Sequence, residues 1–275
     1  VEEMNQSKLR FFTNISHEFR TPLTIIIGQM ETLLQMQAFA PSVYNKLLNV
    51  YKNGIQLREL ISELLDFRKQ EQGHMKIKVS RHNLIDFLYE NYLLYAEYAA
   101  TRQIDFRFVK EEDELEVWYD ARQIQKIINN LLSNAFKYTP QSGTIVVHVC
   151  RNDDKAVVEV RNTGKGIEPE ELEKIFTRFY QVENNSAVSE GTGIGLALSK
   201  GLAELHHGTL TANSTPGGET VFTLTLNLGK EHFTDEQLDE TPKEEVVAAK
   251  TDAFLITGQE ELEKEPMKER IKGAK

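Results

Sequence analysis

Residues 12–23, with the sequence FTNISHEFRTPL, place a histidine, a carboxylate and a hydroxyl where they could do chemistry together. Apolar residues recur there at steps of three and four, which predicts an amphipathic helix. His17 lies off the apolar stripe beside Glu18, and Thr21 follows one turn later on the same face. An isolated His–Glu pair on a helix is more often a solvated polar face, so the rest of the chain decides between the two interpretations.

Two long helices are predicted to hold this reactive face. Residues 4–37 keep a heptad-like apolar seam, Pro41 marks a turn, and a second helix covers about residues 43–72 before Gly73 ends it. An isolated hairpin cannot bury both seams, whereas two hairpins paired in a four-helix bundle can. The sequence therefore predicts a homodimer through residues 1–73.

From residue 74 the pattern changes to short alternating runs between helices. Strands are predicted at residues 75–80, 104–109, 115–119, 144–151, 156–161, 209–214 and 220–226, and helices at 84–101, 120–138, 169–176 and 193–206. This order predicts an α+β domain over residues 74–230, a sandwich with a mixed sheet and helices on one face.

Composition limits the function classes. The 275 residues carry a net charge of −10, which argues against a nucleic-acid-binding protein. No apolar run approaches the roughly 20 residues that span a bilayer, and because residue 1 is Val we expect a piece of a longer chain. Residues 231–275 hold 13 acidic and 7 basic side chains, which predicts an acidic linker or disordered tail. Cys150, the single cysteine, fits a reducing compartment and is expected to be a small buried residue, and no Cys or His spacing suggests zinc.

Asn130, Asn134 and Lys137 lie on one face of the helix predicted after Asp120. An amide oxygen is a ligand suited to Mg²⁺, and a lysine suits a phosphate. Two asparagines one turn apart can also be a solvated face, so this motif needs support from the rest of the domain.

Two glycine-rich stretches follow. Asn162-Thr-Gly-Lys-Gly-Ile167 comes straight after a strand, where glycines let the backbone approach a flat ligand. Gly191-Thr-Gly-Ile-Gly195 opens a helix, whose N–H groups can bind an anion. A polar loop at 183–190 precedes it and its spacing is GxGxG, which argues against a Rossmann dinucleotide site.

In this order, the stretches resemble the sensor histidine kinases of two-component systems over about residues 4–228. The matched motifs are the H-box at 17–23, the N-box at 130–137, the G1 box at 162–166, the F-box at 175–180 and the G2 box at 191–195. The resemblance implies a dimerisation and histidine-phosphotransfer hairpin followed by a Bergerat-fold ATP-binding domain. It also implies a cytoplasmic location as part of a longer membrane-bound sensor, which in hybrid members carries its own receiver domain.

The resemblance also implies a mechanism. His17 would attack the γ-phosphorus of ATP with Glu18 as general base, and the phosphoryl group would pass to an aspartate of a response-regulator receiver domain. Thr21 matches the position that can orient water for phosphatase action on that partner. Asn134 would hold Mg²⁺, and Lys137 and Arg178 would neutralise phosphate charge. The other positions expected to contact the nucleotide are Asn130, Tyr138, Asn162, Gly164, Gly166, Ile167, Gly191, Thr192, Gly193, Gly195 and Leu196.

Two positions distinguish this chain within that resemblance. Related ATPases of the fold place a glutamate base at position 130, and because an amide cannot take a proton, Asn130 favours transfer to a residue over ATP hydrolysis. The G1 box usually begins with Asp, which accepts a hydrogen bond from the adenine amino group, whereas Asn162 accepts it without charge assistance. The alternatives are a degenerate ATP site in a phosphatase or dimeric scaffold, a module that binds nucleotide without phosphorylating itself, and a purely structural dimer.

Overall fold

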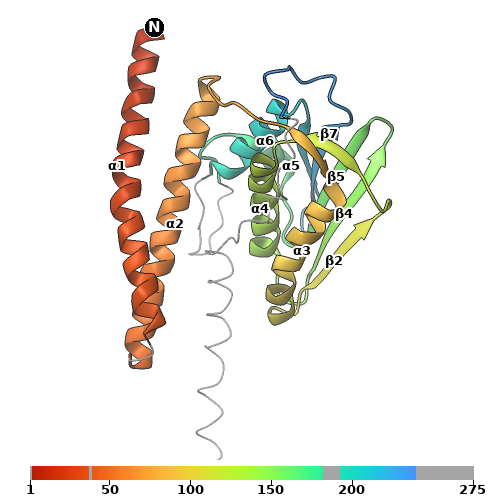
Figure 1. Ribbon diagram of the computed structural model, residues 1–275. Coiled ribbons are helices and arrows are strands. Elements are labelled where there is room, and N and C mark those ends of the chain that lie inside the picture. Colours follow the sequence, from red (N-terminus) through yellow and green to blue (C-terminus); the bar gives the residue numbers. More distant parts are fainter. Residues whose placement is uncertain (1, 37–38, 182–192, 240–275) are drawn as a thin grey trace, which may run out of the picture. The chain divides into compact units, whose positions relative to one another are not determined.

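The computed structural model describes residues 2–36, 39–181 and 193–239, with side chains in the first helix from Glu18 onward (Figure 1). The chain divides into two compact units between Met75 and Lys76. Within the described residues, no helix has both the length and the apolar character needed to cross a bilayer.

The first unit is a hairpin of α1 (Glu2–Gln35) and α2 (Pro41–Glu71). Pro41 opens α2 at a position where its missing N–H costs nothing, and Gly73 adopts a positive φ of 66° just past its end. The two helices bury a common cluster, consisting of Leu23, Ile27, Tyr51 and Ile55, with Met30, Leu34 and Ile61 packed against it. The two helices form as the apolar pattern predicts.

The second unit contains a mixed five-stranded sheet in the order β2-β4-β5-β7-β6. Its strands are β2 (Asp105–Lys110), β4 (Thr144–Asn152), β5 (Lys155–Thr163), β6 (Thr209–Ser214) and β7 (Glu219–Asn227). Only the pairing of the edge strand β2 with β4 is parallel. A separate antiparallel pair is formed by β1 (Ser80–Asn83) and β3 (Glu116–Tyr119), so β1 begins where the strand predicted at 75–80 ends.

Three helices cover one face of this sheet (Figure 1): α3 (Leu84–Thr101), α4 (Ala121–Tyr138) and α6 (Gly195–Leu205). The segment predicted as one helix at 169–176 is a short α5 (Pro169–Leu172) followed by a 3₁₀ turn (Lys174–Phe176). The fold class expected from the sequence, a helical hairpin followed by an α+β domain with a mixed sheet and helices on one face, is confirmed.

Strand alternation decides which side chains reach the helices. In β4, Ile145, Val147 and Val149 are buried beneath the helices, so the intervening His148 and Cys150 point to the opposite, open face of the sheet. Cys150 is only partly buried there. The expectation of a buried cysteine is therefore wrong, because the register of β4 places its even-numbered residues on the open face.

The segment after Gly229 packs onto the second unit, which differs from the tail expected to start at residue 231. Phe233 is buried in a cluster with Ile77 and Val79. The Val79 N–H donates to Gln237 O at 2.8 Å, and the Asp239 N–H donates back to Val79 O at 2.9 Å. Residues 231–239 therefore form part of the packed domain, and the rest of the expected tail lies outside the described residues.

Candidate active site

Helix α4 is fixed at its beginning by Asp120, whose Oδ1 accepts hydrogen bonds from the backbone N–H groups of Arg122 at 3.1 Å and Gln123 at 3.3 Å. The backbone N–H of Asp120 donates to Nε2 of the buried His206 at 3.1 Å. Nδ1–H of His206 in turn donates to Leu202 O at 2.7 Å. The end of α6 therefore holds the start of the helix that carries the asparagine motif.

The His206 contact makes the second unit's stability depend on pH. Burial lowers the pKa of His206 from its ordinary value of 6.5, and its Nε2 can accept the Asp120 N–H only when it carries no proton. As pH falls below 6.5, the unfolded chain takes up the proton first, so we expect the free energy of unfolding to decrease until the lower, folded-state pKa is passed.

Urea unfolding at pH 7.5 and pH 5.5 measures this dependence. Because Gln does not titrate, His206→Gln is expected to show a smaller difference between the two pH values than the native chain. The pKa of His232 is also lowered by burial. His232→Gln is therefore measured in the same way, so that the effects of the two histidines on the pH difference can be compared. An unchanged pH difference in His206→Gln would contradict the assignment.

Asn130 and Asn134 lie one turn apart on the polar side of α4, where both are partly buried. Asn134 Nδ2 donates to Asn130 Oδ1 at 3.3 Å, and Asn130 Nδ2 donates to Ser199 Oγ of α6 at 2.9 Å. Because Asn134 uses an N–H in this contact, its amide oxygen stays available as a ligand for a hard cation. Lys137 is exposed one turn further on, with its Nζ 5.2 Å from the centre of the exposed Tyr138 ring.

The beginning of α6 approaches the same asparagine. A Cβ added at Gly195 would lie 2.6 Å from Asn130 Oδ1, so glycine lets α6 begin this close to α4 with the Asn130 side chain in its present position. Ile194, at the N-cap position of α6, provides no side-chain hydrogen bond. Within the described residues, no N-cap side chain bonds the first N–H groups of α6, and such groups at a helix N-terminus can bind phosphate oxygens.

The F-box is joined to the last glycines of the G2 box. The Phe179 N–H donates to Gly193 O at 2.9 Å, and Gly193 has a φ of 67°, which favours glycine. Phe179 itself has a positive φ of 60° and an exposed side chain, a conformation that costs a bulky residue energy. Arg178, next to it, is exposed.

The G1 box brings the end of β5 close to the end of α4. A Cβ at Gly164 would lie 2.6 Å from Tyr138 O, and the Gly164 N–H donates to Gly218 O at 2.9 Å. Gly166 has a φ of 69° and passes against Thr215 O so closely that a side chain would not fit. Ile167, which follows, donates its N–H to Ser214 Oγ at 2.9 Å.

Asn162 is 5% exposed and lies on β5 directly opposite Thr220 of β7. Among the described residues its side chain makes one hydrogen bond, from Nδ2 to Thr163 O at 3.3 Å, which leaves its oxygen to accept one from a ligand. Thr220 is buried beside it, with Oγ1 2.7 Å from Ser214 Oγ. The sequence analysis missed Thr220 and Ser214, because only the pairing of β5, β6 and β7 brings them to the G1 box.

The predicted site residues thus fall into two groups. Asn130, Asn134, Asn162, Gly164 and Gly195 are gathered at the ends of α4 and β5 and the start of α6 in the second unit, where Leu196 is partly buried in the first turn of α6. His17, Glu18 and Thr21 belong to α1 of the first unit, where Glu18 and Thr21 are exposed. The side chain of His17, and Gly191, Thr192 and the loop predicted at 183–190, lie outside the described residues.

Comparisons with known proteins agree with this division. Residues 7–73 match the family described as "His Kinase A (phospho-acceptor) domain", and residues 119–230 match "Histidine kinase-, DNA gyrase B-, and HSP90-like ATPase". The chain is 39% identical over 243 residues to histidine kinase P4 of Formosa agariphila, covering 86% of this chain. It spans 18% of that kinase's length, and 15% and 24% of two further curated relatives.

Two solved structures share the fold. ShkA, solved at full length in complex with AMPPNP, has a TM-score of 0.68 at 21% identity, over 80% of this chain and 46% of that one. Histidine kinase ThkA, solved in complex with the response regulator protein TrrA, has a TM-score of 0.56 at 24% identity, over 84% of this chain and 66% of that one. With a phospho-acceptor hairpin matched in the first unit and an ATPase domain matched in the second, the chain carries a histidine kinase core.

Proposed function

We propose that this chain is the catalytic core of a sensor histidine kinase that uses Mg·ATP to phosphorylate His17 and then passes the phosphoryl group to an aspartate of a response-regulator receiver domain. The observation that carries the proposal is the contact of Gly195 at the start of α6 with Asn130 of α4, beside Asn134. It puts a helix N-terminus, a cation ligand and a lysine at one place, which suits a nucleoside triphosphate and its metal ion.

The residues divide the work as follows. Asn162 and Thr220, at the buried end of β5 and β7, suit a purine ring with an amino group to donate. Asn134 would hold Mg²⁺, which when bound neutralises and orients the phosphates, and Lys137 and Arg178 supply further positive charge. His17 would attack the γ-phosphorus with one ring nitrogen, the bond to the β–γ bridging oxygen would break to release ADP, and Glu18 would accept the proton from the other ring nitrogen. Asn130, an amide, provides no base for water, so the site favours transfer over hydrolysis.

The glycine contacts of the described residues and the amide pair argue against a degenerate ATP site. Gly164, Gly166 and Gly193 each lie where the backbone leaves no room for a side chain, and the asparagines that would face the phosphates hydrogen-bond one another. The proposal therefore favours an active kinase over a scaffold or a phosphatase that has lost ATP binding.

The receiver-domain partner is proposed from the family and from ThkA, which was solved with a response regulator. A phosphoryl group on nitrogen transfers readily to a carboxylate, and Thr21, one turn from His17, is exposed on α1. Because ATP and a response regulator would both be met in the cytoplasm, we propose that this core belongs to the cytoplasmic part of a longer sensor.

The homodimer is proposed from apolar side chains that a single hairpin leaves exposed. Phe19 is 58% exposed and Ile25 60%, both on α1, and Val50 and Leu57 are about half exposed on α2. Pairing with a second hairpin would remove this surface from water. Light scattering on the purified chain tests it: a monomer at tens of micromolar would contradict the dimer.

The test of the kinase is incubation with γ-labelled ATP and Mg²⁺, followed by mapping of the label by mass spectrometry. We expect label that is lost in acid, kept in base and located on His17, and no label when Mg²⁺ is chelated. Binding of ATP without label would favour a nucleotide-binding module, and absence of ATP binding would favour a structural dimer.

Asn162 gives a further prediction. Asn162→Asp is expected to raise the affinity for ATP about fivefold, because an ionised oxygen accepts a stronger hydrogen bond, worth about 1 kcal/mol here. The same change should lower the melting temperature without ATP, because Asn162 is buried and a carboxylate there is poorly hydrated. Calorimetric titration and thermal unfolding measure the two effects, and a weaker affinity for ATP would contradict this role.

A further inference from the structure

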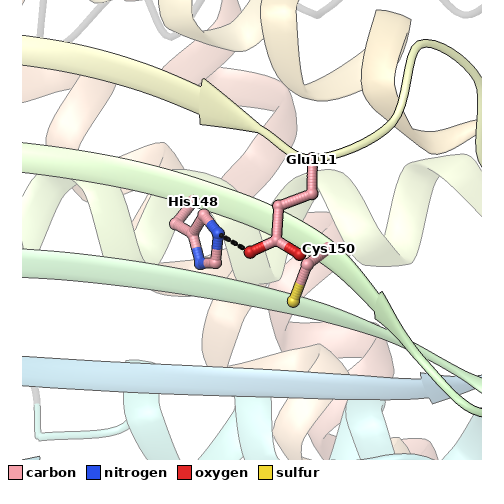
Figure 2. A group of neighbouring side chains, drawn as sticks. All are labelled: Glu111, His148 and Cys150. Carbon is pink, nitrogen blue, oxygen red and sulfur yellow. Dashed lines mark hydrogen bonds and ion pairs between the residues drawn. The ribbon is translucent and has the colours of Figure 1, made fainter.

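A second cluster of chemically active side chains lies on the open face of the sheet, where the nucleotide residues are absent. His148 and Cys150 point outward from β4, and Glu111 follows the end of the edge strand β2. Figure 2 shows the three side chains gathered at this edge, with Glu111 facing His148. Asn162 has the opposite orientation on the sheet, since it is buried on the helix-covered face.

The distances suit a metal ion. One ligand atom from each of Glu111, His148 and Cys150 lies within 4.8 Å of the other two, and His148 Nε2 is 3.0 Å from Glu111 Oε1. Ligands of a tetrahedral zinc ion are roughly 3.3–3.8 Å apart, given metal–ligand bonds of about 2.0–2.3 Å. Small side-chain rotations are sufficient, and the Glu111 side chain is exposed and able to make them.

The surroundings of His148 orient the ring as a metal ligand. Its Nδ1 lies 3.2 Å from Glu159 Oε2, and Glu159 is held in turn by Arg161, whose Nε donates to the same oxygen at 3.1 Å. When His148 Nδ1–H donates to Glu159, His148 Nε2 has a lone pair that points at the Glu111 carboxylate. Nε2 and Glu111 Oε1 are then two hydrogen-bond acceptors 3.0 Å apart, so a proton or a metal ion must lie between them. A carboxylate behind a histidine that binds through its other nitrogen is the usual support of a zinc ligand.

The charge and donor types favour a borderline-soft cation. Partial burial raises the pKa of the Cys150 thiol, and the carboxylates of Glu111 and Glu159 raise it further. The negative potential of these carboxylates disfavours a free thiolate, but the same potential attracts a cation. When the metal ion binds, it replaces the proton of the Cys150 thiol, and one H⁺ is released. A thiolate, an imidazole and a carboxylate together match zinc and disfavour Mg²⁺ or Ca²⁺.

We propose that Glu111, His148 and Cys150 form a binding site for a zinc-class divalent cation, separate from the ATP site, with water as the fourth ligand. The ion would link the end of β2 to β4. The backbone already brings these strands together there, since the Glu111 N–H donates to Val149 O at 3.2 Å. Because β2 is an edge strand and its only partner in the sheet is β4, the ion would hold the edge in place.

Titration of the 275-residue chain with Zn²⁺ alone, in buffer free of thiols, Mg²⁺ and ATP, measures this site by calorimetry. We expect one ion per chain, release of a proton and a rise in melting temperature on the order of 5 °C at saturating zinc. Cys150→Ser and His148→Gln should each weaken binding at least about 100-fold, and Glu159→Gln about tenfold. Glu114→Gln and His74→Gln, which replace exposed residues of the same types, should bind zinc as the native chain does.

Cobalt supplies an independent readout. Cys150 is the chain's one cysteine, so a thiolate-to-Co²⁺ absorption band can come from no other residue, and it should vanish in Cys150→Ser. Circular dichroism without metal shows whether each variant folds. If Cys150→Ser or His148→Gln does not fold, Glu111→Gln, which changes an exposed ligand, is used in its place. No zinc binding, cobalt binding without the thiolate band, or native affinity in folded Cys150→Ser and His148→Gln would each overturn the proposal.

Discussion

His17→Gln is expected to remove all label above background when the chain is incubated with γ-labelled ATP and Mg²⁺. The loss should be about three orders of magnitude or more, because the glutamine amide nitrogen has no lone pair available for attack on phosphorus. Glutamine is a good helix former, so α1 should keep its structure. Phosphate incorporation per chain, measured over time at saturating ATP, gives the result.

The same variant should bind ATP as tightly as the native chain. Asn130, Asn134, Asn162 and Gly195 all belong to the second unit, whereas His17 belongs to the first. His74→Gln is the matched control, since it replaces an exposed histidine just past α2 and should phosphorylate normally. Label that persists in His17→Gln would mean that another residue is the acceptor, and loss of ATP binding would mean that the substitution acts through the fold.

The helices of the domain could be predicted because their signals are local. Asp120 caps α4 as its spacing to Gln123 indicates, and Gly73 follows the end of α2 as predicted, whereas Pro41, predicted in a turn, is the first residue of α2. The order of strands and helices was sufficient to predict the fold class, because the spacing of apolar residues within each element distinguishes a helix from a strand. The resemblance to sensor histidine kinases, drawn from motif order, is confirmed by the comparisons.

The features that sequence analysis missed depend on register or on distant contacts. Thr220 lies opposite Asn162 only because β7 pairs with β5 in one register. Cys150 reaches the open face because the alternation in β4 places it there, so a cysteine in a β-like run does not by itself indicate which face it takes. The acidic composition after residue 230 concealed Phe233, which packs against Ile77 and Val79 although they lie 156 and 154 positions earlier in the chain.

Gly195→Ala is expected to weaken ATP binding about 30-fold, or roughly 2 kcal/mol. On helix propensity alone, alanine would be favoured over glycine by up to about 1 kcal/mol. The added Cβ would instead meet Asn130 Oδ1 at 2.6 Å, so either α6 moves away from α4 or Asn130 leaves its contacts with Ser199 and Asn134. Either shift changes the distance between the α6 N–H groups and the Asn134 oxygen. These are the groups proposed to contact the phosphates and their Mg²⁺ ion, so ATP binding should weaken.

Gly28→Ala is the control for this change, because it adds the same methyl group to a helix where nothing lies within 4 Å of the new Cβ. It should bind ATP normally and melt at the same temperature or slightly higher. Calorimetric titration with Mg·ATP compares the two variants, and thermal unfolding without nucleotide confirms that Gly195→Ala is folded. Native affinity for ATP in Gly195→Ala would show that the contact between α6 and Asn130 does not shape the nucleotide site, and the proposed placement of the phosphates would then be wrong.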